Sequence, residues 1–213
     1  MPYYGWTVVC NAQDNLNFIE HFLNNSEVLR KYLSPLPASS YHVTIHGIWS
    51  NGIKPLPQQK EWVANNLNNF EQEQFYKEAK QVGKPCNENS IFKLLKELQI
   101  IINNSEWSPP KLYFDRIYYT GNTLGIAFKS CSDLNHINNM RVNLMNHSGV
   151  NDHMGHYHMT LAYAYKQINE ADIQQLNNEI NTLISALSTQ TFTLDKAFVA
   201  RFKDMTEFEP CFD

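Results

Sequence analysis

Apolar and polar residues follow two periodicities along this chain. Runs rich in β-branched and aromatic residues predict strands, whose successive side chains point to opposite faces. These runs cover residues 3–10, 39–49, 112–119, 123–129, 156–165 and 191–202. Apolar residues spaced three or four positions apart predict helices instead. The helical segments cover residues 16–33, 61–80, 90–102, 132–145 and 169–187.

The order of these segments repeats itself. A strand, a helix and a second strand open the chain, and a similar series follows residues 51–110. This order predicts a duplicated α+β arrangement in which helices cover the outer faces of two sheets. A chain of 213 residues can bury one sizeable core, so we expect residues 1–213 to form one domain. Residues 51–110 are then a helical elaboration between strands.

Two of the predicted strands carry the same four-residue pattern. Residues 42–45 and residues 158–161 both read histidine, apolar, threonine, apolar. Alternation along a strand places the histidine and the threonine on one face and the two apolar residues on the other. A single histidine on a strand is usually a packed or surface residue. The repeated pair predicts that folding brings the two copies together.

Such a meeting would provide the groups needed for phosphodiester hydrolysis. His42 and His158 in one cavity suit general acid–base catalysis near neutral pH, because one imidazole takes a proton while the other donates one. The hydroxyls of Thr44 and Thr160 would donate hydrogen bonds to the non-bridging phosphate oxygens. The sequence contains no GxSxG nucleophile elbow, which argues against a triad hydrolase.

These two tetrads, one early and one late in the chain, resemble the motifs of the 2H phosphoesterase superfamily. That superfamily includes the RNA 2′,3′-cyclic phosphodiesterases and the 2′–5′ RNA ligase-like proteins. Residues 39–48 further resemble an uncharacterised bacterial and fungal branch, in which small residues lead into the first tetrad.

The resemblance implies an α+β fold of two pseudo-symmetric lobes, with antiparallel sheets facing a central cleft and helices on the outside. It also implies that His42 and His158 are the catalytic pair and that Thr44 and Thr160 bind the substrate phosphate. Neither a metal nor another cofactor is expected. The implied activity is hydrolysis of a nucleotide or RNA-end phosphodiester, with a 2′,3′-cyclic phosphate as one candidate.

Three further residues are candidates for substrate contact. His46 shares the predicted face of the first tetrad and either lines the cleft or lies in solvent at the strand end. Trp49 and Tyr163 are candidates for stacking on a base. Regular alternation puts both on the packed side, so each needs a bulge or a strand end to reach the cleft.

Two other functions remain open at this point. Asp152, His153 and His156 lie close together in sequence and could form a metal-dependent hydrolase site, although their spacing is not a known zinc signature. Alternatively, the protein is a non-catalytic RNA- or nucleotide-binding module that keeps the cleft without turnover.

Composition and charge restrict partners and compartment. A formal net charge of −4 argues against a broad duplex-binding surface, which needs a basic face. None of the four cysteines has CxxC or zinc-finger spacing, which predicts free thiols in a reducing compartment. No leader peptide and no apolar run of membrane-spanning length is visible. We therefore expect a cytoplasmic monomer without a membrane partner, although leaderless export would leave no trace in the sequence.

Overall fold

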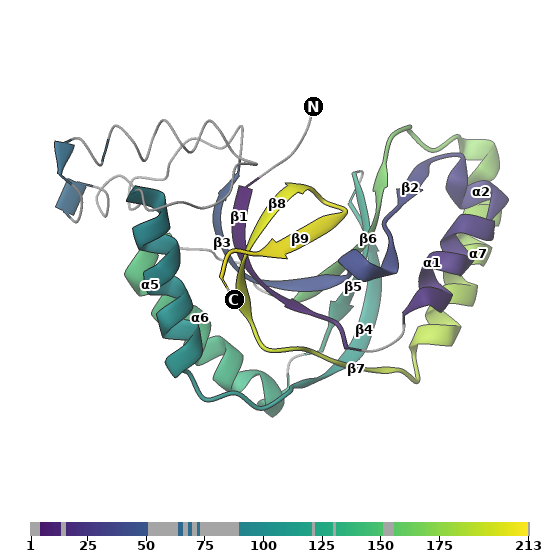
Figure 1. Cartoon of the computed structure of the whole chain (residues 1–213). Coiled ribbons are helices and arrows are strands. Elements are labelled where there is room, and N and C mark those ends of the chain that lie inside the picture. Colours follow the sequence, from purple (N-terminus) through teal and green to yellow (C-terminus); the bar gives the residue numbers. More distant parts are fainter. Residues whose placement is uncertain are drawn as a thin grey trace.

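Two antiparallel sheets form the centre of the molecule, with helices on both outer sides (Figure 1). The structure is a computed structural model and describes residues 5–13, 16–50, 64–65, 68–69, 72, 90–120, 122–129, 131–150 and 156–212. The predicted helix at 61–80 lies almost entirely outside these residues. This architecture confirms the α+β class.

The first sheet has four strands in the order β3-β1-β8-β9. These strands are β1 (Gly5–Asn11), β3 (His42–Ser50), β8 (Phe198–Asp204) and β9 (Glu207–Pro210). The two edge strands of this sheet, β3 and β9, approach each other. The rings of His42 on β3 and Phe208 on β9 lie 3.8 Å apart between centroids, although β1 and β8 separate these strands in the sheet.

The second sheet has five strands in the order β2-β6-β5-β4-β7. These strands are β2 (Leu33–Pro35), β4 (Lys111–Tyr119), β5 (Thr123–Phe128), β6 (His158–Ala164) and β7 (Thr191–Thr193). The predicted hairpin is confirmed as β4 and β5. The two tetrads lie on different sheets, and β3 and β6 contact each other where the sheets meet.

Five α-helices in the described part of the chain cover the outer faces. Helices α5 (Ser90–Asn104) and α6 (Asn135–Ser148) contact β8 and β3, respectively. On the opposite side of the molecule, α1 (Asn17–Asn25), α2 (Glu27–Arg30) and α7 (Ile173–Leu187) contact strands of the second sheet (Figure 1). Gly149 ends α6 with a φ of 67°, a left-handed conformation that suits glycine.

The single helix predicted for residues 16–33 is wrong. Ser26 is extended and its Oγ accepts a hydrogen bond from the Leu29 N–H at 3.0 Å, which caps a new helix, α2. The last residues of the predicted helix form β2, which pairs with β6. Both helices and the strand contribute buried apolar side chains, whose spacing in the sequence resembles the stripe of one continuous helix.

The strand predicted for residues 191–202 is also wrong in its extent. Its first part, β7, pairs with β4, whereas its later part, β8, pairs with β1 in the other sheet. Residues 194–197 carry the chain from one sheet to the other. The unpredicted β9 has Phe208 as its sole aromatic residue among charged neighbours, so its sequence lacks the usual apolar alternation.

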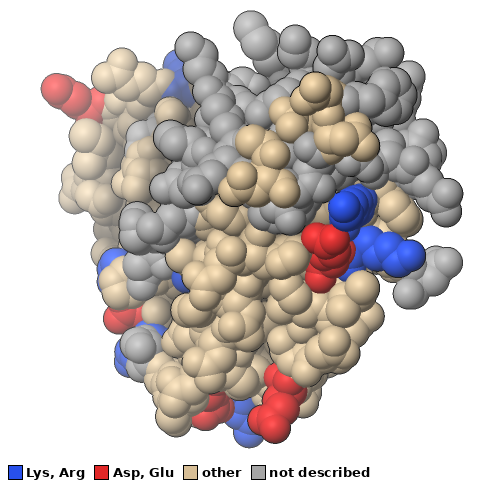
Figure 2. All heavy atoms as spheres, turned by 90° about the vertical axis from the view of Figure 1, so that its left-hand side faces the viewer, with Lys and Arg blue, Asp and Glu red and all other residues tan. Residues whose placement is uncertain are grey.

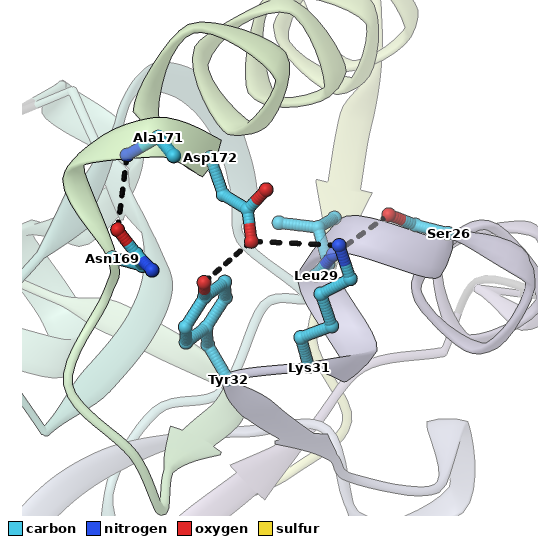
Figure 3. A network of polar contacts seen from close by, with 7 residues as sticks. All are labelled: Ser26, Leu29, Lys31, Tyr32, Asn169, Ala171 and Asp172. Carbon is cyan, nitrogen blue, oxygen red and sulfur yellow. Dashed lines mark hydrogen bonds and ion pairs between the residues drawn. The ribbon is translucent and has the colours of Figure 1, made fainter.

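A network of hydrogen bonds connects the turn between α2 and β2 to the start of α7 (Figure 3). Asp172 Oδ2 accepts hydrogen bonds from the Tyr32 hydroxyl at 2.6 Å and from Lys31 Nζ at 3.4 Å. The hydrogen bond from Tyr32 is the main reason that the pKa of Asp172 lies below its ordinary value. Because Asp172 precedes α7, the network holds that helix against α2. Helix α2 also contacts β2, which pairs with β6, the strand that carries the second tetrad.

The outer face over α5 and α6 shows mostly uncharged side chains, with acidic and basic residues scattered among them (Figure 2). Within the described part of the chain, none of the helices combines the length and apolar character required to cross a membrane.

Candidate functional site

The two histidines and two threonines of the tetrads line a single cavity of about 700 Å³. Both sheets contribute to its walls, so the cavity lies where the sheets face each other. Its described lining residues are Ser34, Leu36, His42, Thr44, Tyr118, Thr120, Thr123, His158, Thr160, Tyr163, Asp204, Met205 and Thr206. Residues from the two halves of the chain thus share one site.

The apolar members of both tetrads face the core. Val43, Ile45, Met159 and Leu161 are fully buried, as strand alternation predicts. Their burial anchors the strands from behind. The histidine and threonine of each tetrad are thereby held on the opposite face, toward the cavity.

Each tetrad ends in a β-bulge at its fourth residue. On β3, Val9 pairs with Thr44 and Val8 pairs with His46, which leaves Ile45 as the extra residue. On β6, Gly125 pairs with Thr160 and the preceding residue of β5 pairs with Ala162, which leaves Leu161 as the extra residue. A bulge shifts the alternation of the residues that follow it. The two halves share this irregularity as well as the tetrad.

The bulges determine whether two of the candidates for substrate contact, His46 and Tyr163, face the cavity. His46 does not line the cavity, because the bulge turns it to the packed side, where it is fully buried and its Nε2 hydrogen-bonds Ser148 Oγ of α6 at 2.8 Å. Tyr163 does line the cavity, because the bulge at Leu161 turns it there. The side chain of Trp49 lies outside the described structure.

His42 is held in one orientation. Its Nδ1 lies 2.7 Å from the carbonyl oxygen of Ser40. A carbonyl only accepts hydrogen bonds, so Nδ1 carries the hydrogen and the neutral ring presents a lone pair at Nε2. The turn that supplies this carbonyl, η1 (Ala38–Ser40), is fixed in turn because Glu20 of α1 accepts a hydrogen bond from the Ala38 N–H at 2.7 Å.

Burial controls the charge of His42. The residue is 6% exposed, and the ring of Phe208 lies against it. The pKa of His42 is lowered to about 4, mainly by burial; the hydrogen bond to Ser40 partly opposes this shift, and nearby His158 contributes to it. His42 is therefore uncharged at neutral pH.

His158 has a related but looser setting. Its Nδ1 lies 3.5 Å from the carbonyl oxygen of His156, which is two residues earlier, as Ser40 is relative to His42. The side chain is partly exposed in the cavity. The ring of Tyr118 meets it edge-on, with centroids 5.7 Å apart and an interplanar angle of 87°.

Tyr118 is a site residue that the sequence patterns did not reveal. Tyr118, Gly125 and Thr160 occupy one row across β4, β5 and β6. Gly125 has no side chain, so the tyrosine ring lies across it and its hydroxyl hydrogen-bonds the Thr160 side chain. A glycine within a strand is a signal for such a close approach, but it does not identify the residue that approaches.

We expect Gly125→Ala to displace Tyr118. An added Cβ would lie 2.5 Å from Tyr118 Cζ and 2.6 Å from the Met159 carbonyl oxygen, closer than either contact tolerates. Overpacking of this kind costs about 1–3 kcal/mol of unfolding free energy, which chemical denaturation would measure. In the double variant Gly125→Ala, Tyr118→Ala, part of the loss should be recovered. Strict additivity of the two changes would contradict this contact.

The described wall of the cavity contains no lysine or arginine. It includes Asp204, whose Oδ1 accepts hydrogen bonds from the Thr206 hydroxyl at 2.5 Å and the Thr206 N–H at 2.8 Å. These hydrogen bonds lower the pKa of Asp204, so it remains a carboxylate at neutral pH. The polar groups that face a ligand are thus hydroxyls, imidazoles and one anion.

The metal-site alternative is only partly visible. Asp152 and His153 lie outside the described residues, whereas His156 is exposed. Among the residues whose positions are described, no group of three or more histidine, cysteine, aspartate or glutamate side chains could hold a metal ion.

Comparison with known proteins identifies the fold. The crystal structure of a conserved protein of unknown function, ATU0111 from Agrobacterium tumefaciens strain C58, matches this chain with a TM-score of 0.65 at 16% identity, covering 99% of this chain and 85% of that one. The uncharacterized protein 127L of Invertebrate iridescent virus 6 is 28% identical over 74 residues. That match spans 32% of this chain and 32% of the viral protein. No family model matches the chain.

Proposed function

We propose that this protein is a metal-independent phosphodiesterase of the 2H phosphoesterase type, which hydrolyses a nucleotide or RNA-end phosphodiester. One observation carries the proposal: His42, Thr44, His158 and Thr160, from two sheets, line a single cavity. Histidines on strands of two different sheets would not be expected to line the same cavity unless they act together.

The geometry supports a division of work between the two residue types. The histidines exchange protons with the attacking water and the leaving oxygen, which is the usual role of imidazole near neutral pH. The hydroxyls of Thr44 and Thr160 donate hydrogen bonds to the non-bridging oxygens, where negative charge grows during attack. Tyr118 hydrogen-bonds the Thr160 side chain, which holds that side chain in place.

The charge of the cavity favours a phosphodiester over a terminal phosphate. A diester carries one negative charge, whereas a terminal phosphate carries nearly two at neutral pH. A described wall without lysine or arginine and with the Asp204 carboxylate would bind the second charge poorly. A volume of about 700 Å³ lies within the range of small-molecule sites, and Tyr163 offers a ring to a nucleobase.

A substrate panel tests the proposal. The purified protein should hydrolyse at least one member of a set of 2′,3′-cyclic nucleotides, 3′,5′-cyclic nucleotides and 2′–5′-linked dinucleotides, and the rate should be unchanged by a strong chelator. Activity that disappears with the chelator and returns with a divalent metal would favour the metal-dependent hydrolase. Tight binding of a panel member without turnover would favour the binding module.

A further inference from the structure

We propose that the protein has a second binding site on the reverse face of the five-stranded sheet, and that it takes a free fatty acid, with the alkyl chain in an apolar cavity and the carboxylate at Lys166. This site goes beyond the proposed phosphodiesterase function and does not depend on it. It lies between the sheet and helices α2 and α7, which contact each other on one side of the molecule (Figure 1).

The cavity has a volume of about 310 Å³, and we call it the apolar slot. Its described lining residues are aliphatic apart from Tyr119 and Asn177. A volume of this size falls within the range of small-molecule sites, and a nearly apolar lining favours an apolar ligand over water. Helix α7 and the strands of the sheet supply most of this lining, with Leu33, Ile117, Leu124, Ile173, Leu176 and Ile180.

Strand alternation separates the slot from the cavity of the tetrads. On β4, Tyr118 lines the cavity of the tetrads, whereas Ile117 and Tyr119 line the slot. On β5, Thr123 lines the cavity of the tetrads and Leu124 lines the slot. Successive side chains of a strand point to opposite faces of the sheet. The sheet therefore stands between a ligand in the slot and a substrate at the tetrads.

Helix α7 leaves the slot beside its first turns. Its last apolar residues, Leu183 and Leu187, are buried. Its earlier ones, Ile173, Leu176 and Ile180, line the slot and keep some exposure, which reaches 43% at Ile173. Removing this apolar surface from water is favourable, so an alkyl chain in the slot would complete the burial that α7 begins.

A more polar cavity adjoins the slot and contains one lysine. Tyr119 and Ile168 line both cavities, so the two are neighbours. Lys166 is the one charged residue among the described residues of this second cavity, and its Nζ lies 5.7 Å from the centroid of the Tyr32 ring. A ligand that spans the two cavities therefore places its apolar part in the slot and its head group beside a cation.

The charges around Lys166 suit a single carboxylate. Asp172 interacts electrostatically with Lys166, but its carboxylate already accepts hydrogen bonds from Tyr32 and Lys31 (Figure 3). Two lysines and one carboxylate leave one net positive charge, which a singly charged acid would balance. The formal net charge of −4 opposes attraction to an anionic membrane, so the ligand we propose is a free acid.

A series of saturated fatty acids from hexanoate to tetradecanoate tests the slot. Isothermal titration calorimetry on the purified protein, with each acid below its critical micelle concentration, would measure the affinities. Affinity should rise about fourfold for each methylene group that enters the slot and should stop rising once the slot is full. Absence of binding would overturn the proposal, as would a rise that continues through the longest acid, because adsorption on an open surface has no such limit.

Leu176→Trp tests the location of the alkyl chain. The larger side chain should occupy the slot and abolish measurable binding of decanoate. Asn178→Trp is the matched control, because Asn178 is exposed on α7 and is not one of the described residues that line the slot. Ile173→Glu, at a position that is already exposed, should also weaken binding and keeps the test valid if Leu176→Trp does not fold. Equal binding by all of these variants would overturn the proposed location.

Lys166 is tested by exchanging charges. The unmutated protein should bind decanoate more tightly than decanol, and decanol more tightly than decylammonium. Lys166→Glu should weaken decanoate binding by about two- to tenfold and reverse this order, whereas Lys166→Arg should keep it. An order that survives Lys166→Glu would overturn the role of Lys166. Binding to anionic phospholipid vesicles without binding of free decanoate would assign this face to a membrane and overturn the proposal.

Discussion

Replacing either His42 or His158 with glutamine is expected to lower kcat/KM for a cyclic phosphodiester by about 10²–10⁴-fold. Glutamine keeps a polar side chain of similar length but cannot exchange a proton near neutral pH. The double variant should be little worse than the more severe single variant, because proton removal and proton donation act in one step. Steady-state kinetics of the two single variants and the double variant would measure this.

His21→Gln is the matched control, because His21 is exposed on α1 and is not one of the described residues that line the cavity. It should retain the unmutated rate. Full activity in both His42→Gln and His158→Gln would mean that the tetrads do not carry the chemistry. Circular dichroism on each variant separates a lost catalytic group from a lost fold.

The second large effect is expected in stability at low pH. The pKa of His42 is about 4 in the folded protein, whereas the unfolded chain has the ordinary value of about 6.5. Between these values the unfolded state binds the extra proton, so acid favours unfolding. As the pH falls from 6.5 to 4, this one residue should remove about 3 kcal/mol from the unfolding free energy.

Denaturant unfolding of the unmutated protein and of His42→Gln, at several pH values between 7 and 4, would isolate this contribution. The carboxylates titrate in both proteins, so the difference between the two curves reports His42. The unmutated protein should lose more stability than the variant across this window. Parallel curves would show that His42 is not held neutral by the fold.

The sequence was sufficient for the elements whose own periodicity is strong. Helices α5, α6 and α7 and the β4–β5 hairpin lie close to their predicted positions, since each has a regular apolar pattern and clear turn residues at its ends. The buried apolar residues of the two tetrads also follow from alternation alone. These features depend on neighbours within a few residues.

The misplaced features depend on pairing between distant segments. Strand β2 exists because residues 33–35 meet β6, and Tyr118 reaches Thr160 only because Gly125 separates them in the row. The two bulges reverse alternation after the fourth tetrad residue, which sends His46 to the core and Tyr163 to the cavity. The sequence of one strand does not reveal where a bulge will form when that strand pairs with a neighbouring strand.

The pairing of β1 with β8 has a consequence for how the protein is made. These strands join residues 5–11 to residues 198–204, nearly the whole chain apart. Contacts of such long sequence separation form late and slowly. While the ribosome is still synthesising the chain, β1 and β3 can form only a two-stranded ribbon with an open edge. His42 is therefore covered only after β8 and β9 have been synthesised. A nascent chain stalled before β8 would leave His42 exposed to solvent.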